Sequence, residues 1–447
     1  MKKIIFSFLA VLLCTFFIAP AFANKDNNMD KNLMVEKLKN STLVIYKNGK
    51  IEEFKEKGIT PLLNYTDKKN LKGAYAFDRI IGRAAANLYA YFDCEFVYGD
   101  VISKPAIEIL EKNNIKYEYK TLTDEIQNRD KTDLCPFEKL TKDCRTPYEA
   151  YAKIYKKIHP EKAIVYFSKE ITPEILIKMY EITGKKLTGN VAVKLHSGEP
   201  GGNNFLKAEF VAPLVKYLNG TIVECNTAYQ GRRNTTRKHK EVLAEHGFTS
   251  IAKTDIMDEE GEIMLPVEGG VQIKVNYVGS HLKNYDSMLV LSHFKGHQMA
   301  GFGGALKNLS IGIASANGKG YIHGGGNALN MWTCKQEKFL QSMADADKSV
   351  VDYMKNNLVY INVMNNLSID CDCNNHPTPP KMKDIGVLSS VDPVALDRAC
   401  VDLVYNSNDS GKDTLIKRIE DKKGTLTIDY AEKLNVGTKD YKLVKVK

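Results

Sequence analysis

Short apolar runs alternate with amphipathic segments along most of the chain. Apolar runs with strand character lie at 41–46, 73–77, 95–102, 117–122, 163–167, 190–195, 221–224, 271–278, 288–291 and 359–363. Between them, apolar residues at helical spacing predict helices that include 79–92, 105–113, 206–218, 334–356 and 393–405. Strands that alternate with helices are typical of parallel sheets covered by helices, so we expect an α/β protein with a small first domain and a larger second domain whose sheet is mostly parallel.

The first residues have the features of a secretory signal. Lys2 and Lys3 precede an apolar run over 4–18, and Ala21-Phe22-Ala23 is a small-x-small cleavage site. We expect a signal peptide and an exported protein, periplasmic or secreted; an uncleaved anchor is the alternative, because residues 4–23 are barely enough to span a bilayer. The predicted organisation is a signal peptide at 1–23, a flexible polar lead-in at 24–40, a first domain at 41–151, a linker at 152–162 and a second domain at 163–447.

Composition restricts the classes of function. Of the 447 residues, 43% are apolar and 26% are charged, as in ordinary globular proteins. The formal net charge of +9 is spread along the chain without a basic block, which argues against nucleic-acid binding. No segment after the signal could cross a membrane. Cys14 lies in the signal, and export would permit disulfides among the other cysteines, but their number fixes neither a pairing nor an oligomeric state.

The segment 287–326 is the strongest candidate for a ligand site. A buried-type apolar run at 288–291 is followed by Ser292 and His293, and a glycine-rich turn comes next before a helix. Such turns hold anions through backbone N–H groups, so we expect this one to bind a small anion such as a carboxylate or phosphate; the alternative is that the glycines only permit tight packing. The expected binding residues are Gly301, Gly303, Gly304, Lys307 and Asn308, and the candidate acids, bases or ligands are His196, His293, Lys295, His297 and His323.

The run Ile369–His376, with the sequence IDCDCNNH, predicts a partial metal site. Two thiolates, carboxylates and an imidazole stand together after a predicted strand, and such a set suits zinc or an iron–sulfur centre. The candidate ligands are Cys371, Cys373, His376 and Asp372. Two alternatives stay open, namely disulfides to other cysteines and a polar loop without a ligand. A bond between the two neighbouring cysteines is sterically awkward.

Two further polar segments follow predicted strands. Arg232 and Arg233 could bind an anionic substrate bidentately, or they could begin an exposed helix. In the first domain, Asn128, Arg129 and Cys135 could bind a ligand, or their segment could simply cap the helix that begins at Pro136.

The first domain resembles the domain of unknown function family 1893. The resemblance covers about 41–151 and rests on TLVIYKNGKI, KGAYAFDRIIGRAAA, DVISKPAIEILEKNNI and, most specifically, NRDKTDLCPFEKL. It implies a three-layer fold like that of cytidine deaminases. Zinc deaminases need a His or Cys with a Glu on one helix and Pro-Cys-x-x-Cys on the next. Because 83–86 reads RAAA and 105–109 reads PAIEI, zinc-hydroxide deamination is not expected.

The second domain resembles the domain of unknown function family 362 over about 163–445. The shared motifs are VAVKLHSGEPGG, NTAYQGRR, LSHFKGHQMAGFGGALKNLSIGIAS, INVMNNLSIDCDC and IGVLSSVDPVALDRACVDL. Relatives are often iron–sulfur proteins with inserted ferredoxin-type Cys-x-x-Cys runs. This chain has only Cys334 between 327 and 357, so ferredoxin-type clusters are not supported.

These patterns predict a metal-dependent or redox-associated enzyme that acts on a small anionic substrate. The alternative is a non-catalytic exported protein that binds a small ligand. Both hypotheses require that the Cys371–Cys373 loop and the His293–Asn308 loop face one shared cavity.

Overall fold

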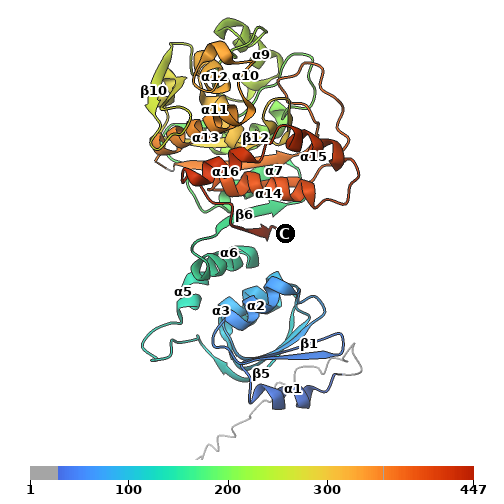
Figure 1. Ribbon diagram of the computed structural model, residues 1–447. Coiled ribbons are helices and arrows are strands. Elements are labelled where there is room, and N and C mark those ends of the chain that lie inside the picture. Colours follow the sequence, from blue (N-terminus) through green and yellow to red (C-terminus); the bar gives the residue numbers. More distant parts are fainter. Residues whose placement is uncertain (1–28, 356) are drawn as a thin grey trace, which may run out of the picture. The chain divides into compact units, whose positions relative to one another are not determined.

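The structure is a computed structural model that describes residues 29–355 and 357–447 (Figure 1). The predicted signal peptide and the start of the predicted lead-in lie outside the described residues. The chain divides after Asp143 into two compact units. The first contains a mixed five-stranded sheet and the second a larger, mostly parallel eight-stranded sheet, which confirms the α/β class. Among the described residues, no helix has the length and apolar character needed to cross a membrane.

The sheet of the first unit has the strand order β2-β1-β3-β4-β5. Its strands are β1 (Leu43–Lys47), β2 (Lys50–Phe54), β3 (Tyr75–Ile81), β4 (Phe96–Ser103) and β5 (Lys116–Thr123), and its helices are α1 (Lys31–Leu38), α2 (Thr60–Lys68), α3 (Arg83–Tyr91), α4 (Lys104–Lys112) and α5 (Pro136–Thr141). The tight turn from β1 to β2 uses Asn48 and Gly49, whose φ angles of 51° and 74° are those of a favoured hairpin turn.

Residues expected to form a flexible lead-in instead form helix α1. Asp30 caps this helix, because its carboxylate accepts hydrogen bonds from the N–H groups of Asn32 and Leu33. Met34 and Leu38, four residues apart on one face, are buried in the core beneath β1 and β3. The sequence prediction missed this helix because the lysines around those two residues make the segment look polar throughout.

The sheet of the second unit has the order β17-β6-β16-β15-β12-β7-β8-β9. The strands are β6 (Ala163–Ser168), β7 (Val191–Lys194), β8 (Thr221–Glu224), β9 (Thr254–Ile256), β12 (Ser287–His293), β15 (Leu358–Met364), β16 (Gly386–Ser390) and β17 (Tyr441–Lys445). Every residue of β12 and β15 is buried, as expected for central parallel strands covered on both faces.

Helices and two small hairpins surround this sheet. The helices are α6 (Pro147–Ile158), α7 (Pro173–Glu181), α8 (Ala208–Tyr217), α9 (Thr236–Glu245), α10 (Phe248–Ile251), α11 (Ala305–Ile313), α12 (Ala316–His323), α13 (Gln336–Tyr353), α14 (Pro393–Tyr405), α15 (Lys412–Asp421) and α16 (Leu426–Lys433). The hairpins are β10 (Glu262–Pro266) with β11 (Val275–Gly279), and β13 (Lys295–His297) with β14 (Gly301–Gly303); η1 (Ser280–Asn284) and η2 (Ala328–Asn330) are short 3-10 helices.

Strand order places a crevice at the end of β7. The chain adds β8 and then β9 on one side of β7 and returns to place β12 on its other side, and all four strands are parallel. Loops that leave the carboxyl ends of β7 and β12 therefore run in opposite directions. In parallel α/β sheets this switch point is where ligands bind.

Candidate metal and anion site

A cavity of about 270 Å³ lies at the carboxyl ends of β7, β8 and β12. Of the residues that the sequence predicted as site residues, those that line it are His196, Arg233, His293, Lys295, His297, Gly303, Gly304, Lys307, Asn308, His323 and Cys373. The loop after β12 and the loop after β15 therefore face one cavity, as both functional hypotheses required.

Asp372 holds these two loops together. Its carboxylate accepts a hydrogen bond from His293 Nδ1 at 2.9 Å and pairs with Lys295 Nζ at 2.8 Å. Although burial opposes ionisation, His293 and Lys295 hold the pKa of Asp372 well below its usual range. The N–H of Gly296 also donates to the Ser368 carbonyl at 2.8 Å. The Asp372 oxygens are thus engaged by two cationic partners, which argues against the predicted role as a metal ligand.

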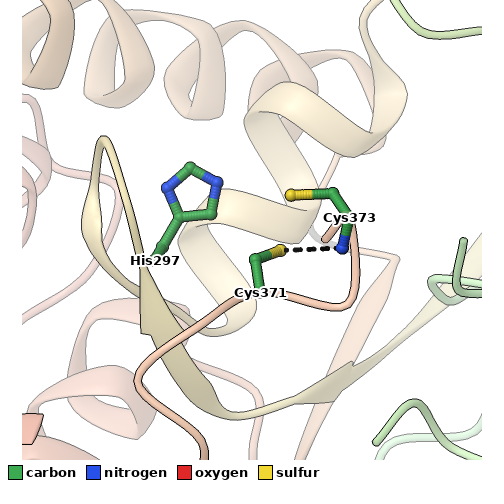
Figure 2. A group of neighbouring side chains, drawn as sticks. All are labelled: His297, Cys371 and Cys373. Carbon is green, nitrogen blue, oxygen red and sulfur yellow. Dashed lines mark hydrogen bonds between the residues drawn. The ribbon is translucent and has the colours of Figure 1, made fainter. Parts of the chain in front are cut away.

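His297, Cys371 and Cys373 surround one small space (Figure 2). Each offers one ligand atom, and these atoms lie within 4.8 Å of one another. None of the eight cysteines in the described part of the chain is in a disulfide. The group is therefore a candidate metal site, with His297 from β13 in the place that the sequence analysis gave to His376. The backbone N–H of His376 closes a local turn onto Asn374, and its side chain is not part of the group.

Cys371 and Cys373 shift each other's pKa in opposite directions. The hydrogen bond from Cys373, together with Lys307 and Lys295, lowers the pKa of Cys371 well below its usual range, and the same hydrogen bond raises the pKa of Cys373. Cys371 is accordingly the thiolate of the pair, because the cations of the cavity face it. A thiolate is the form that binds soft metals and reacts with electrophiles.

The tautomer of His297 limits how it could bind a metal. Its Nδ1 accepts hydrogen bonds from the N–H groups of Met299, at 3.1 Å, and Ala300, at 2.9 Å. Burial lowers the pKa of His297 to about 4, so the ring is neutral and its proton is on Nε2. Coordination of a metal through Nε2 would require that this nitrogen lose its proton or that the β13–β14 hairpin change its conformation. The two cysteine sulfurs are therefore the stronger part of the donor set.

Lys307 is the cation available to a ligand. Lys194 Nζ donates to Asn308 Oδ1 at 3.0 Å, and Lys319 Nζ donates to the Ala314 carbonyl at 2.6 Å. Arg233 Nε donates to Glu199 Oε1 at 2.9 Å, and Lys295 pairs with Asp372. Among the cations that line the cavity within the described residues, only Lys307 has no acceptor. An anion that enters the cavity would meet this ammonium, which also influences the titration of the thiols.

The glycine turn has a different role from the predicted one. The carboxylate of Asp397, from α14, accepts the first two free N–H groups of α11, those of Ala305 at 2.8 Å and Leu306 at 2.9 Å. A Cβ on Gly304 would lie 2.4 Å from Asp397 Oδ1, and one on Gly301 would lie 2.9 Å from the Gly424 backbone. These glycines allow close packing, and the helix N-terminus is already occupied by a protein carboxylate.

The three other histidines differ in what they can offer. Both ring nitrogens of His293 face oxygen acceptors, Asp372 and the Asn365 carbonyl, so both act as donors and the ring anchors the loops. His196 Nδ1 accepts from the Gly198 N–H at 3.0 Å, which leaves a proton on Nε2. His323 Nδ1 donates to the Lys319 carbonyl at 2.7 Å, which leaves Nε2 as an acceptor. Burial lowers the pKa of His196 and of His323 to about 3, so both are neutral.

Comparison with known families agrees with this division of the chain. Residues 191–402 match the family described as Domain of unknown function (DUF362), and residues 31–158 match the family described as Domain of unknown function (DUF1893). The parts of the chain that contain these two matches are called the DUF1893 domain and the DUF362 domain below. The DUF362 match contains every residue that lines the cavity and all three residues of the candidate metal site.

Solved structures are similar to one part of the chain or the other. A DUF1893 family protein from Thermotoga maritima is 26% identical over 31% of this chain and 99% of its own, with a TM-score of 0.28. For the lactate racemase apoprotein from Thermoanaerobacterium thermosaccharolyticum, the identity is 15% over 54% of this chain and 57% of its own, with a TM-score of 0.34. The chain thus spans little more than half the length of that protein. No curated protein matches this chain.

Sequence reasoning missed several residues of the DUF362 cavity. Glu224 Oε1 accepts hydrogen bonds from the N–H of Ser197 at 2.7 Å and from its hydroxyl, and Lys194 lies 3.4 Å from the other carboxylate oxygen. Although burial opposes it, Lys194 and His239 keep the pKa of Glu224 well below its usual range. A charged residue at the end of each apolar strand, in VAVK and TIVE, was the signal that could have found this pair.

Arg232 and Arg233 separate into two roles. Arg233 is buried and bound to Glu199, as described above. Arg232 is exposed and paired with Glu245 at 2.5 Å, and it does not line the cavity. For Arg232 the structure therefore favours the alternative of an exposed helix start over substrate binding.

The candidate ligand residues of the DUF1893 domain form a turn. Asn128 Oδ1 accepts from the Thr132 N–H at 3.0 Å, Arg129 is exposed, and Cys135 directly precedes α5. Glu138, from α5, is buried and accepts the Ala84 N–H at 3.2 Å. It fills the start of α3, in the segment 83–86 where the sequence analysis found no zinc ligand. These contacts support the capping alternative for this segment.

Proposed function

We propose that the DUF362 domain is a metal-dependent, redox-associated enzyme that acts on a small anionic substrate. The observation that carries this proposal is the convergence of Cys371, Cys373 and His297 within 4.8 Å at the wall of a cavity that also presents the unpaired ammonium of Lys307. Thiolate donors select zinc or iron over hard cations. Once bound, such a metal would supply a Lewis acid or an electron carrier beside the substrate.

The remaining cavity residues would bind and orient the substrate. Lys307 would pair with its anionic group. His196 would donate a hydrogen bond from Nε2, and His323 would accept one at Nε2, so a substrate with both an acceptor and a donor would be held in one orientation. Asp372, His293 and Lys295 would fix the thiol loop and would not touch the substrate. The proposal also includes export, on the features of residues 1–23.

For the DUF1893 domain we infer a deaminase-like fold that has no zinc chemistry. Its mixed sheet supports the fold, and Glu138 at the start of α3 supports the absence of the first ligand. No reaction is proposed for it.

Metal analysis of anaerobically purified protein tests the enzyme proposal. We expect zinc or iron at close to one equivalent or above, and an absorption band in the visible region if the metal is iron. A double variant, Cys371→Ser with Cys373→Ser, should lose the metal. Cys334→Ser is the matched control, because Cys334 lies outside the thiol group, and it should keep the metal.

A non-catalytic ligand-binding protein is the second candidate, and the tautomer of His297 favours it. With Nδ1 engaged by two N–H groups, the ring is arranged to donate to a thiolate and not to hold a metal. Protein that contains no metal, and whose anion affinity is lost in Lys307→Gln but unchanged in the double Cys variant, would support this candidate and contradict the first.

A further inference from the structure

The cavity has an apolar side that the proposed function does not use. Met299, Ile311, Met331 and Trp332 line it, together with the ring of Tyr229. His297 and His323 are buried, whereas Trp332 is 69% exposed and therefore marks the open end. A charged inner end and an apolar mouth are the two halves of a site for an amphipathic molecule.

We propose that the substrate is an organic anion with an apolar group, whose charge pairs with Lys307 and whose apolar group packs on Trp332 and Met331. This proposal rests on the anion site described above and adds the class of substrate.

The size of the cavity supports an anion larger than acetate. On the same measure a cavity needs roughly 10–15 Å³ to hold one water, so about 270 Å³ has room for a ligand much larger than a water molecule. A free acetate or phosphate at Lys307 would leave most of this space to water in contact with apolar side chains. A carboxylate with an aryl or alkyl chain would replace that water.

The segment that carries Trp332 is fixed by contacts on its N-terminal side. Gly325 and Gly326 have φ angles of 63° and 93°, which turn the chain after α12, and Gln272 Nε2 donates to the Gly325 carbonyl at 2.7 Å. Asn327 caps η2 by accepting the Leu329 N–H at 3.1 Å. The exposed indole is therefore presented at the mouth by an ordered turn. The large apolar face of a tryptophan that lines a cavity can pack on the apolar part of a ligand.

The fluorescence of Trp332 can be used to measure binding, because Trp332 is the only tryptophan in the chain. Its fluorescence therefore reports on the mouth of the cavity alone. We would titrate the full-length protein, with the metal it retains on purification, with acetate, butyrate, hexanoate and 3-phenylpropionate, and with the neutral alcohol 3-phenylpropanol. Calorimetry would give the affinities for variants that lack the indole.

Affinity should rise with chain length by about two- to fourfold for each added methylene, because each is removed from water at the mouth. Fluorescence should change with hexanoate and 3-phenylpropionate but not with acetate. Trp332→Ala should weaken 3-phenylpropionate binding by about tenfold or more and leave acetate unchanged, and Trp332→Phe should restore most of the loss. Met264→Ala is the control, because Met264 is 67% exposed and does not line the cavity.

Each contrary outcome identifies which proposal fails. Equal affinity for acetate and 3-phenylpropionate, both lost in Lys307→Gln, would overturn the apolar subsite and keep the anion site. Binding of 3-phenylpropanol as tightly as of 3-phenylpropionate, with no effect of Lys307→Gln, would overturn the anion site and keep the apolar one. Absence of binding by every probe would overturn both.

Discussion

Buried charges at the site are balanced by partners that are distant in the sequence. Asp372 and His293 are separated by 79 positions, and Lys194 and Glu224 by 30. A charge that is taken out of water keeps its ionised form only when such a partner and further hydrogen bonds are in place. The cavity can therefore hold several cations side by side and still leave only Lys307 for a ligand.

Asp372→Asn should destabilise the DUF362 domain by about 3–5 kcal/mol, because it leaves two buried cations without their common counter-charge. Urea unfolding followed by circular dichroism measures this. Asp421→Asn removes a partner of Lys417 on the exposed face of α15 and should leave the midpoint unchanged. Equal effects of the two substitutions would contradict the assignment of Asp372 as the residue that ties the loops together.

His323 should make stability depend on pH in the acidic range. Burial lowers its folded pKa from 6.5 to about 3, so the unfolded chain binds a proton first as the pH falls. Its contribution is fully present above pH 6.5 and is lost progressively below it, which amounts to about 2 kcal/mol at pH 5.

His323→Phe separates this contribution from those of other groups. The phenyl ring can still stack on Phe339, as the imidazole does with the two ring centres 4.7 Å apart, but it cannot be protonated. Urea midpoints measured at pH 8, 6.5 and 5 should show a smaller loss in the variant than in the parent chain. An identical loss in both would show that His323 is not buried as a neutral ring.

At the scale of elements, α11 is positioned by a carboxylate from another helix. Asp397 accepts the first N–H groups of α11 and also a hydrogen bond from Asn362 Nδ2 at 2.7 Å, on β15. This contact fixes the start of the helix that carries Lys307 and Asn308. The direction of Lys307 into the cavity thus depends on close contact between Gly304 and α14.

Gly304→Ala should be destabilising by about 1–3 kcal/mol and should weaken anion binding, because its Cβ would overlap Asp397 Oδ1. Gly320→Ala, in α12, is the matched control. Its Cβ would lie 3.4 Å from the Ala328 Cβ, which is ordinary contact, and alanine favours a helix interior over glycine by up to about 1 kcal/mol. Thermal unfolding and calorimetric titration with a carboxylate compare the two. The account of α11 would be wrong if both variants behaved alike.

Sequence patterns predicted helices and strands correctly where buried residues recur at regular spacing along the chain. The apolar runs at 190–195 and 288–291 correspond to β7 and β12, and the expected parallel sheet follows from their alternation with helices. The hairpin β13–β14 was predicted as a loop, because three-residue strands are too short to show a period.

The ligand and hydrogen-bond partners of individual side chains were harder to predict than the helices and strands. His376 was selected as a metal ligand over His297 because it is close to the cysteines in sequence, whereas the fold brings β13 to them. The contact of Asp397 with α11 likewise leaves no local signal, and the glycine turn was therefore interpreted as an open anion site. Local pattern fixes which faces are buried, and long-range pairing decides which polar groups remain free.

At the scale of the whole molecule, every residue of the cavity belongs to the second compact unit, which begins at Cys144. The sequence analysis expected a linker at 152–162, but α6 packs on β6 and β17 of this unit. Tyr151 and Tyr155 of α6 are buried, and Lys442 Nζ lies 4.7 Å from the ring centre of Tyr155. The helix is therefore part of the second compact unit, although the DUF1893 match extends to residue 158.

A fragment of residues 144–447 should consequently bind the same metal, at the same ratio per chain, as the full-length protein. It should also keep the full-length affinity for 3-phenylpropionate. A fragment of residues 160–447, which lacks α6, should be less stable by at least about 3 kcal/mol, because several large side chains of α6 no longer cover the sheet. Metal analysis, calorimetry and urea unfolding of the two fragments test this. If 144–447 folded but bound no metal that the full chain binds, the DUF1893 domain would have to take part in the site, and the assignment of the whole site to one unit would be wrong.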